Sequence, residues 1–276
     1  QEGDVEFRLE HGQDSGKRPR ERRSIDERSD VEHPEVLGVL GGMGPEAAVE
    51  FCRRLVEMTP AEKDQEHLPV ILINDPRIPD RTEAIKGKGP SPIEKLAAAA
   101  RRLEECGAGL IAIPCNTAHC WHEALQREVA VPILNIIEAT VEQLKRLSGK
   151  NLAGLMVTDG TLASGLYQKR LEAERIPYIV PSCDDQERVM DVVYSIKRRG
   201  ADSEARAAIR GVAERLTAAG AAALITGCTE LPLALNASTE ELAVPVADSL
   251  SALGEAVLDR MRPGWRSGST KRGSRR

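Results

Sequence analysis

The chain has 276 residues, of which 41% are hydrophobic, 29% charged and only 3% aromatic. The hydrophobic fraction is typical of a water-soluble globular protein, and no stretch approaches the ~18 apolar residues of a membrane helix. Its 38 basic and 43 acidic side chains give a net charge of −5. A mildly acidic chain with so few aromatic rings lacks the basic surface and the stacking rings of nucleic-acid-binding proteins. We therefore expect neither a membrane nor a nucleic acid as partner.

The number of cysteines indicates the redox state of the protein's compartment and whether free thiols are available for chemistry. Six cysteines in 276 residues are too sparse for a disulfide scaffold. No apolar signal segment stands at the N-terminal side. We expect a reducing cytoplasm, in which the thiols are available for chemistry.

The two ends of the chain differ in composition from the part between them. Residues 1–35 are rich in both acidic and basic side chains and poor in apolar ones, so we expect a disordered charged segment. Residues 263–276 form a basic stretch that we expect to be a flexible tail. Between them we predict a first α/β half over 36–148 and a second over 149–262, and a return of the chain to the first half near the C-terminus is compatible with this division.

Short β-branched runs alternate with amphipathic, alanine-rich stretches, which is typical of βα units on a parallel sheet. In chain order, the predicted strands are 36–40, 69–74, 109–114, 133–135, 152–157, 178–181, 222–226 and 244–246. The predicted helices are 45–58, 91–106, 117–128, 138–147, 161–174, 186–199, 204–219 and 248–261.

An internal similarity divides this region in two. Residues 107–115 (GAGLIAIPC) align without a gap on residues 220–228 (GAAALITGC), and residues 37–40 (LGVL) resemble 153–156 (AGLM). The two offsets, 113 and 116 residues, nearly agree. We therefore predict two similar α/β halves, each with a cysteine at the carboxyl end of one strand.

The two repeated cysteines, Cys115 and Cys228, are the main candidates for chemistry. In open α/β sheets, ligands bind at the carboxyl ends of the strands. A following helix start favours the thiolate. The neighbouring Asn116, Thr117 and Thr229 and the adjacent backbone amides could hold a carboxylate between the two sulfur atoms. Two opposed thiols can remove a proton from one face of a carbon acid and deliver one to the other face, which inverts the stereocentre.

Three other interpretations stay open at this point. Residues 42–47 (GMGPEA) fit the dinucleotide fingerprint G-x-G-x-x-A, although the acidic residue Asp75 lies some 30 residues beyond the loop instead of about 20. A metal site could use Cys115, His119, Cys120 and His122, although Cys120 points away from the face that Cys115 and His119 share. The two halves could also form a non-enzymatic, two-lobed ligand-binding protein.

Several motifs together resemble a known family. They are 37–45 (LGVLGGMGP), 64–67 (DQEH), 74–82 (NDPRIPDRT), 114–119 (PCNTAH) and 227–230 (GCTE). Over 36–260 the chain resembles the aspartate racemases of the cofactor-independent aspartate/glutamate racemase family. The resemblance implies a pseudo-symmetric, two-domain α/β fold with mainly parallel sheets flanked by helices and an active site in the cleft between the domains. It further implies an isomerase that interconverts L- and D-aspartate by 1,1-proton transfer without pyridoxal phosphate (PLP), any other cofactor or a metal.

The resemblance also assigns roles to residues. Cys115 and Cys228 match the catalytic positions, and Arg81 and Lys169 fall where the family places cationic contacts to the substrate carboxylates. The expected lining residues are Met43, Asn116, Thr117, Thr158 and Thr229, with Asn74 and Glu230 in supporting positions. Glutamate or broad-specificity racemisation and maleate cis–trans isomerisation stay open as alternative activities. We expect aspartate as the small-molecule partner and a homodimer as the assembly.

Overall fold

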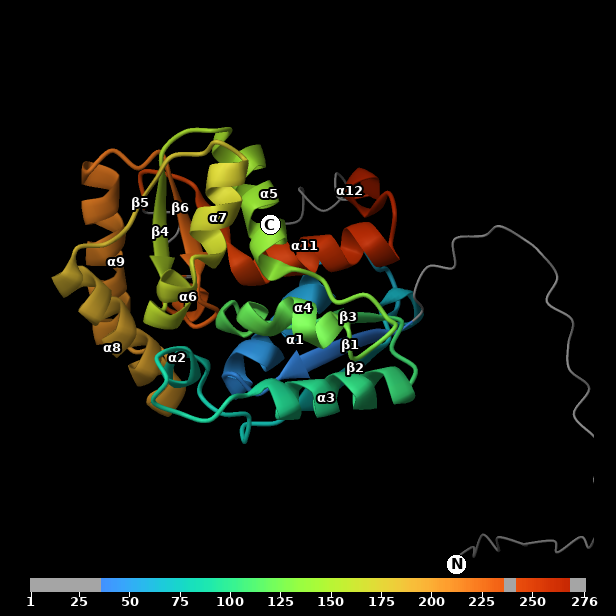
Figure 1. The fold of residues 1–276 in the computed structure, drawn as a ribbon. Helices are drawn as coiled ribbons and strands as arrows, with labels where there is room; N and C mark the ends of the chain where they lie inside the picture. Colours follow the sequence, from blue (N-terminus) through green and yellow to red (C-terminus); the bar gives the residue numbers. More distant parts are fainter. Residues whose placement is uncertain (1–35, 236–241, 269–276) are drawn as a thin grey trace, which may run out of the picture. The chain divides into compact units, whose positions relative to one another are not determined.

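The computed structural model describes residues 36–235 and 242–268, so the predicted disordered segment 1–35 and the end of the predicted tail lie outside the described residues. The described chain forms two parallel sheets flanked by helices (Figure 1). The first sheet has the order β2-β1-β3, and the second has the order β5-β4-β6-β7. This confirms the predicted α/β class with two similar, parallel sheets. No helix in the described part of the chain is long and apolar enough to cross a lipid bilayer.

The seven strands in the described residues lie close to their predicted positions. They are β1 (Leu37–Gly41), β2 (Val70–Asn74), β3 (Leu110–Ala112), β4 (Ala153–Val157), β5 (Tyr178–Ile179), β6 (Ala223–Gly227) and β7 (Val246–Asp248). Strands β1, β4 and β6 are buried at every residue. A strand covered on both faces needs apolar residues on both, which explains their continuous apolar runs.

The helices cover the faces of the two sheets. The long ones are α1 (Pro45–Met58), α3 (Ile93–Glu105), α5 (Ile136–Ser148), α7 (Leu166–Ala173), α8 (Cys183–Arg199), α9 (Ser203–Ala218) and α11 (Ser249–Met261). The short ones are η1 (Asp64–Glu66), α2 (Arg81–Ile85), η2 (Thr117–Trp121), α4 (His122–Gln126), α6 (Asp159–Ser164), α10 (Leu231–Leu235) and α12 (Trp265–Gly268). The predicted division between 148 and 149 falls in the loop between α5 and β4, and the domain boundaries stay a prediction.

Three predicted elements differ in the structure. The strand expected at 133–135 is reduced to one bridge between Ile133 and Ile111, because Asn135 already caps α5 by accepting hydrogen bonds from two backbone amides. The helix expected at 161–174 is broken at Gly165, whose φ of 69° is left-handed and ends α6. The helix expected at 117–128 divides into η2 and α4.

The largest core cluster joins both sheets. It contains Leu37 and Leu110 from the first sheet, Leu155 and Ile225 from the second, and apolar residues of α1, α5 and α11. Two further clusters bury the other faces, with α3 and α4 against the first sheet and α8, α9 and α10 against the second. In this cluster α1 contacts β1, α5 and α11 contact β6 and β7, and α11 packs against both α1 and α5. These helix contacts hold the carboxyl ends of the two sheets in one arrangement.

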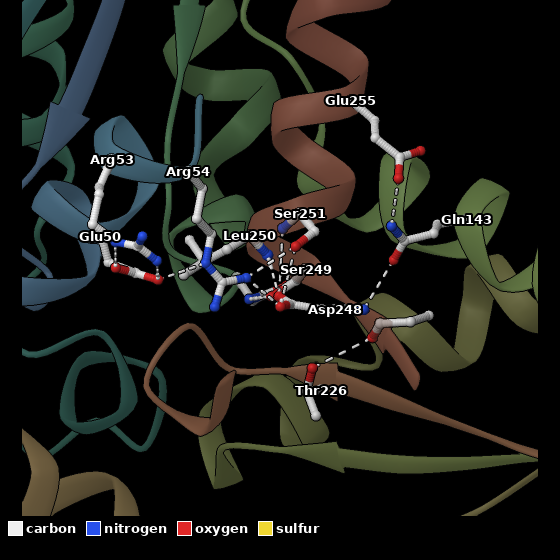
Figure 2. Close-up of polar contacts among 12 residues, drawn as sticks. Glu50, Arg53, Arg54, Gln143, Thr226, Asp248, Ser249, Leu250, Ser251 and Glu255 are labelled. Carbon is white, nitrogen blue, oxygen red and sulfur yellow. Dashed lines mark hydrogen bonds and ion pairs between the residues drawn. The ribbon is translucent and has the colours of Figure 1, made fainter. Parts of the chain in front are cut away.

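A polar network fixes the start of α11 against α1 (Figure 2). Arg54 of α1 forms ion pairs with Glu50 and with Asp248, the last residue of β7. Asp248 also caps α11, accepting hydrogen bonds from the backbone amides of Leu250 and Ser251 at 2.8 and 3.4 Å. The next residue after Asp248 is Ser249, so this network determines where Ser249 lies.

Candidate active site

One cavity is lined by both candidate cysteines. Its walls come from segments that follow the carboxyl ends of β1, β2, β3, β4 and β6, the edge at which α/β sheets bind ligands. The lining residues are Met43, Asp80, Arg81, Thr82, Cys115, Asn116, Thr117, Thr158, Lys197, Cys228, Thr229 and Glu230. Both sheets therefore contribute to one site.

Two predicted site residues do not line this cavity. Lys169 is exposed on α7, so the structure does not place it beside the cysteines; the lysine at the cavity is Lys197 of α8. Asn74 ends β2, and its side-chain amide donates to the carbonyl of Pro45 at 3.2 Å, which supports the loop that carries Met43. The other predicted residues, Met43, Arg81, Asn116, Thr117, Thr158, Thr229, Glu230 and both cysteines, lie together.

Sequence reasoning missed three lining residues, Asp80, Thr82 and Lys197. Lys197 begins a Lys-Arg-Arg run at the end of a helix, a position where basic residues commonly interact with the helix dipole. Nothing in the sequence pattern distinguishes Lys197 from its two neighbours. Asp80 precedes Arg81 and caps α2 by accepting from the amide of Glu83 at 2.9 Å, so the motif 74–82 could have indicated both Asp80 and Thr82.

Cys115 is buried, and a histidine holds its main chain. The carbonyl of Cys115 lies 2.9 Å from Nδ1 of His119, and the amide of Ile136 donates to Nε2 of His119 at 3.1 Å. This arrangement assigns the proton to Nδ1. Burial lowers the pKa of His119 to about 4, so the ring is neutral near pH 7.

The metal interpretation has no support in this geometry. Both ring nitrogens of His119 contact backbone groups, and Nε2 of His122 contacts the carbonyl of Ile133 at 2.9 Å. Within residues 36–235 and 242–268, no group of three or more His, Cys, Asp or Glu side chains is arranged to hold a metal ion. All six cysteines lie in these ranges and are free thiols.

Cys228 has a carboxylate as its direct partner. Its thiol donates to Oε2 of Glu230 at 3.1 Å. Burial, together with the negative charge of Glu230, raises the pKa of Cys228 well above its ordinary value. The expectation that the helix start favours a thiolate is therefore wrong for Cys228, because desolvation and the adjacent carboxylate outweigh the dipole of a five-residue helix.

Glu230 connects Cys228 to the opposite wall of the cavity. The amide of Gly44 donates to Oε1 of Glu230 at 3.1 Å, and Nζ of Lys197 lies 3.9 Å from the same oxygen. Burial acts to lower the pKa of Lys197, but Glu230 and Cys228 raise it above its ordinary value. The loop that resembles a dinucleotide fingerprint thus directs the amide of Gly44 to a carboxylate of the protein.

Arg81 is a buried cation without a carboxylate partner in the described residues. Its Nη1 donates to the carbonyls of Ile78 and Pro79 at 3.1 and 2.8 Å, and its Nε is buried with no hydrogen-bond partner. The two carbonyls that contact this guanidinium carry no charge of their own. The guanidinium is therefore suited to an anionic ligand.

Three threonine hydroxyls join the two halves of the cavity wall. Thr117 lies 2.9 Å from Thr158 and 2.8 Å from Thr161, and the latter two are 3.0 Å apart. Thr158 also caps α6 by accepting from the amide of Thr161. This triangle fixes the segment after Cys115 to the segment after β4.

The comparisons with known proteins identify the family of the chain. The family model for Asp/Glu/hydantoin racemases matches residues 40–257. An aspartate racemase structure from Picrophilus torridus is 34% identical with a TM-score of 0.73, covering 84% of this chain and 98% of that one. A broad-specificity amino-acid racemase of Bacillus subtilis is 26% identical over 234 residues, covering 81% of this chain and 96% of that protein. A glutamate racemase of Corynebacterium diphtheriae is 30% identical over 152 residues, covering 52% of this chain and 55% of that protein. The chain therefore belongs to the Asp/Glu/hydantoin racemase family.

Proposed function

We propose that the protein is a PLP-independent racemase that interconverts L- and D-aspartate through Cys115 and Cys228. The observation that carries this proposal is the cavity itself, in which both thiols lie with two cationic side chains, Arg81 and Lys197. A two-base racemase needs one acid–base group on each face of the stereocentre. The two cysteines come from different sheets, so they can approach a bound substrate from different sides.

The reaction requires one thiolate and one thiol at the start of each turnover. In the proposed mechanism one sulfur removes the Cα proton, and the resulting carbanion is stabilised by hydrogen-bond donors at the α-carboxylate. The other thiol then gives its proton to the opposite face of Cα. For one enantiomer Cys115 removes the proton and Cys228, whose thiol donates to Glu230, gives one to the opposite face; for the other enantiomer the two roles are exchanged.

The charges of the cavity support a dicarboxylate substrate. Lys197 is partly neutralised by Glu230, whereas Arg81 has no carboxylate partner in the described residues. A substrate with two carboxylates and one ammonium group brings a net negative charge to this pair of cations.

A second candidate is racemisation of glutamate or of a broader set of amino acids. It is favoured by the similarity to a broad-specificity racemase and to glutamate racemases. Maleate cis–trans isomerisation also uses a four-carbon dicarboxylate, and a two-lobed binding protein would bind the same ligand without turnover. One set of substrates separates these possibilities.

The test is incubation of the protein with L-aspartate, L-glutamate, L-alanine or maleate in D₂O, followed by chiral chromatography and NMR of the α-position. We expect D-aspartate with deuterium at Cα, and less product from glutamate and alanine. Cys183→Ala, which removes an exposed thiol that does not line the cavity, is the matched control for the cysteine variants described below. Fumarate from maleate, or binding without exchange, would contradict the proposal.

The proposal includes a homodimer in the cytoplasm. The six free thiols are compatible with a reducing compartment. Light scattering coupled to size-exclusion chromatography measures the mass in solution, and we expect twice that of a 30.0 kDa chain. A mass equal to one chain would contradict the dimer.

A further inference from the structure

One tyrosine outside the cavity lining contacts both cysteine-bearing segments. Tyr167 of α7 is fully buried, and its hydroxyl donates to Oδ1 of Asn116 at 2.7 Å. Asn116 directly follows Cys115. The hydroxyl of Tyr167 is thus bonded to the residue next to one of the two thiols.

The nitrogen of the Asn116 side-chain amide is bonded to a residue of a different element, α11. Nδ2 of Asn116 donates to Oγ of Ser249 at 3.0 Å, and Ser249 is fully buried at the start of α11. The position of Ser249 is set by the capping residue Asp248 and its ion pair with Arg54, visible in Figure 2. Asn116 therefore lies between two fixed partners, and its side chain has one defined orientation.

The ring of Tyr167 packs against the segment that carries the second thiol. A Cβ built on Gly227 would lie 2.5 Å from Cε2 of Tyr167 and 2.9 Å from Cζ. Real Cβ contacts are not that short, so the ring occupies the space that glycine leaves open directly before Cys228. Tyr167 therefore contacts the backbone before one thiol and the side chain after the other.

We propose that Tyr167 is a positioning residue that sets the placement of Cys115 relative to Cys228, a role that rests on the proposed two-cysteine reaction. The hydroxyl fixes the position of the Cys115 segment through its hydrogen bond to Asn116, and the ring fixes the position of the Cys228 segment by packing against Gly227. Tyr167 does not line the cavity, so it touches no substrate. Its position matters because two acid–base groups must both reach the same Cα, and a misplacement of about 1 Å can cost about 100-fold in rate.

The hydroxyl and the ring can be tested separately. Tyr167→Phe removes the hydroxyl and keeps the ring against Gly227; we expect kcat for aspartate to fall by about 10- to 100-fold with KM little changed. Tyr167→Leu removes both contacts and should lower kcat further. Tyr178→Phe is the matched control, because the hydroxyl of Tyr178 donates to Glu172 at an exposed position, and we expect it to leave kcat unchanged.

A second readout does not depend on any substrate. The rate of alkylation of each cysteine is followed against pH by peptide mass spectrometry, with the exposed Cys183 as internal reference. Tyr167→Phe should change the profile of Cys115 and leave that of Cys228 as in the wild type, whereas Tyr167→Leu should change both. The alkylation profiles keep the two proposals distinguishable. A wild type without racemase activity would refute the proposed function, and the profiles would still test the role of Tyr167.

Ser249→Ala removes the other hydrogen-bond partner of the Asn116 side chain. The test therefore does not depend on the folding of one variant. If Asn116 is held by both partners, Tyr167→Phe combined with Ser249→Ala should cost less in kcat than the two single losses multiplied. A lower melting temperature of Tyr167→Phe with unchanged kcat and unchanged cysteine profiles would show a purely structural role and overturn the inference. Equal changes at both cysteines in Tyr167→Phe would also overturn it.

Discussion

The preference for a dicarboxylate should depend on Arg81. The thiols act only on Cα and its proton, so they cannot select aspartate over alanine. Arg81 is 7% exposed, and its contacts in the described residues are two backbone carbonyls and no carboxylate. Replacing it with alanine removes a positive charge that no other group at the cavity duplicates, since Lys197 is shared with Glu230.

The expected size of the effect follows from this environment. A hydrogen bond to a charged group in a desolvated site contributes about 1.5–3 kcal/mol. Arg81→Ala should therefore lower kcat/KM for aspartate by about 10- to 150-fold. Arg81→Lys should recover part of the loss, because it keeps the charge but not the fork of donors that binds a carboxylate at two points.

The assay compares aspartate and alanine across wild type, Arg81→Ala and Arg81→Lys by chiral chromatography. Arg77→Ala is the matched control: Arg77 lies on the same loop, but its side chain is 79% exposed and pairs with Asp75. We expect the control to behave as wild type. Melting temperatures show whether the loop that Arg81 binds through Ile78 and Pro79 stays folded.

The outcome on alanine decides the interpretation. If Arg81 binds the distal carboxylate of aspartate, the residual turnover of alanine should change little in Arg81→Ala. An equal loss on alanine and aspartate would refute this reasoning and would mean that Arg81 holds the α-carboxylate or the loop. Lys197 would then become the better candidate for the distal carboxylate.

Three further expectations concern the two thiols, Glu230 and Glu50 of α1. Cys115→Ala and Cys228→Ala should each lower racemisation by about 100-fold or more with the circular dichroism spectrum unchanged, since each enantiomer needs a base on its own face; a folded variant that keeps more than about a tenth of the rate would exclude the pairing. Glu230→Gln should move the pH profile of Cys228 alkylation to lower pH, because it removes a negative charge that raises the pKa of the thiol; a profile that stays in place would contradict the role of Glu230. Hydrogen bonds from Arg53 help to lower the pKa of Glu50 from 4.5 to about 2. The stability that Glu50 contributes is therefore present above pH 4.5 and is lost as the pH falls toward 2. In chemical denaturation, the free energy of unfolding of Glu50→Gln should fall less over this range than that of the wild type, and an identical acid profile would count against this.

The repeat in the sequence predicted the symmetry of the fold. The alignment of 107–115 with 220–228 corresponds to β3 and β6, and that of 37–40 with 153–156 corresponds to β1 and β4. In the first sheet β1 lies next to β3, and in the second sheet their counterparts β4 and β6 are neighbours in the same way. Cys115 follows β3, and Cys228 follows β6. Apolar runs and glycines are local signals, so strand positions and the ends of strands could be read without knowing the tertiary contacts.

The details of the site could be predicted only in part. The resemblance indicated most of the lining, because its motifs include the residues directly beside the two cysteines. Lys169 is exposed on α7 and does not line the cavity, so its contact with the substrate stays a prediction. Lys197 comes from a helix far along the chain, and only the packing of α8 beside the cavity distinguishes it from the arginines that follow it.

The sequence by itself therefore determined the α/β class, the two-fold repeat and the two cysteines, because periodicity, strand ends and short motifs are properties of neighbouring residues. The tertiary structure decided which cation faces the cavity, that Cys228 is a thiol bonded to Glu230, and that Tyr167 lies between the two cysteine-bearing segments. These features depend on burial and on contacts between residues far apart in the chain. Desolvation raises the pKa of Cys228 even though a helix start follows it, and no local pattern reports how deeply a side chain is buried.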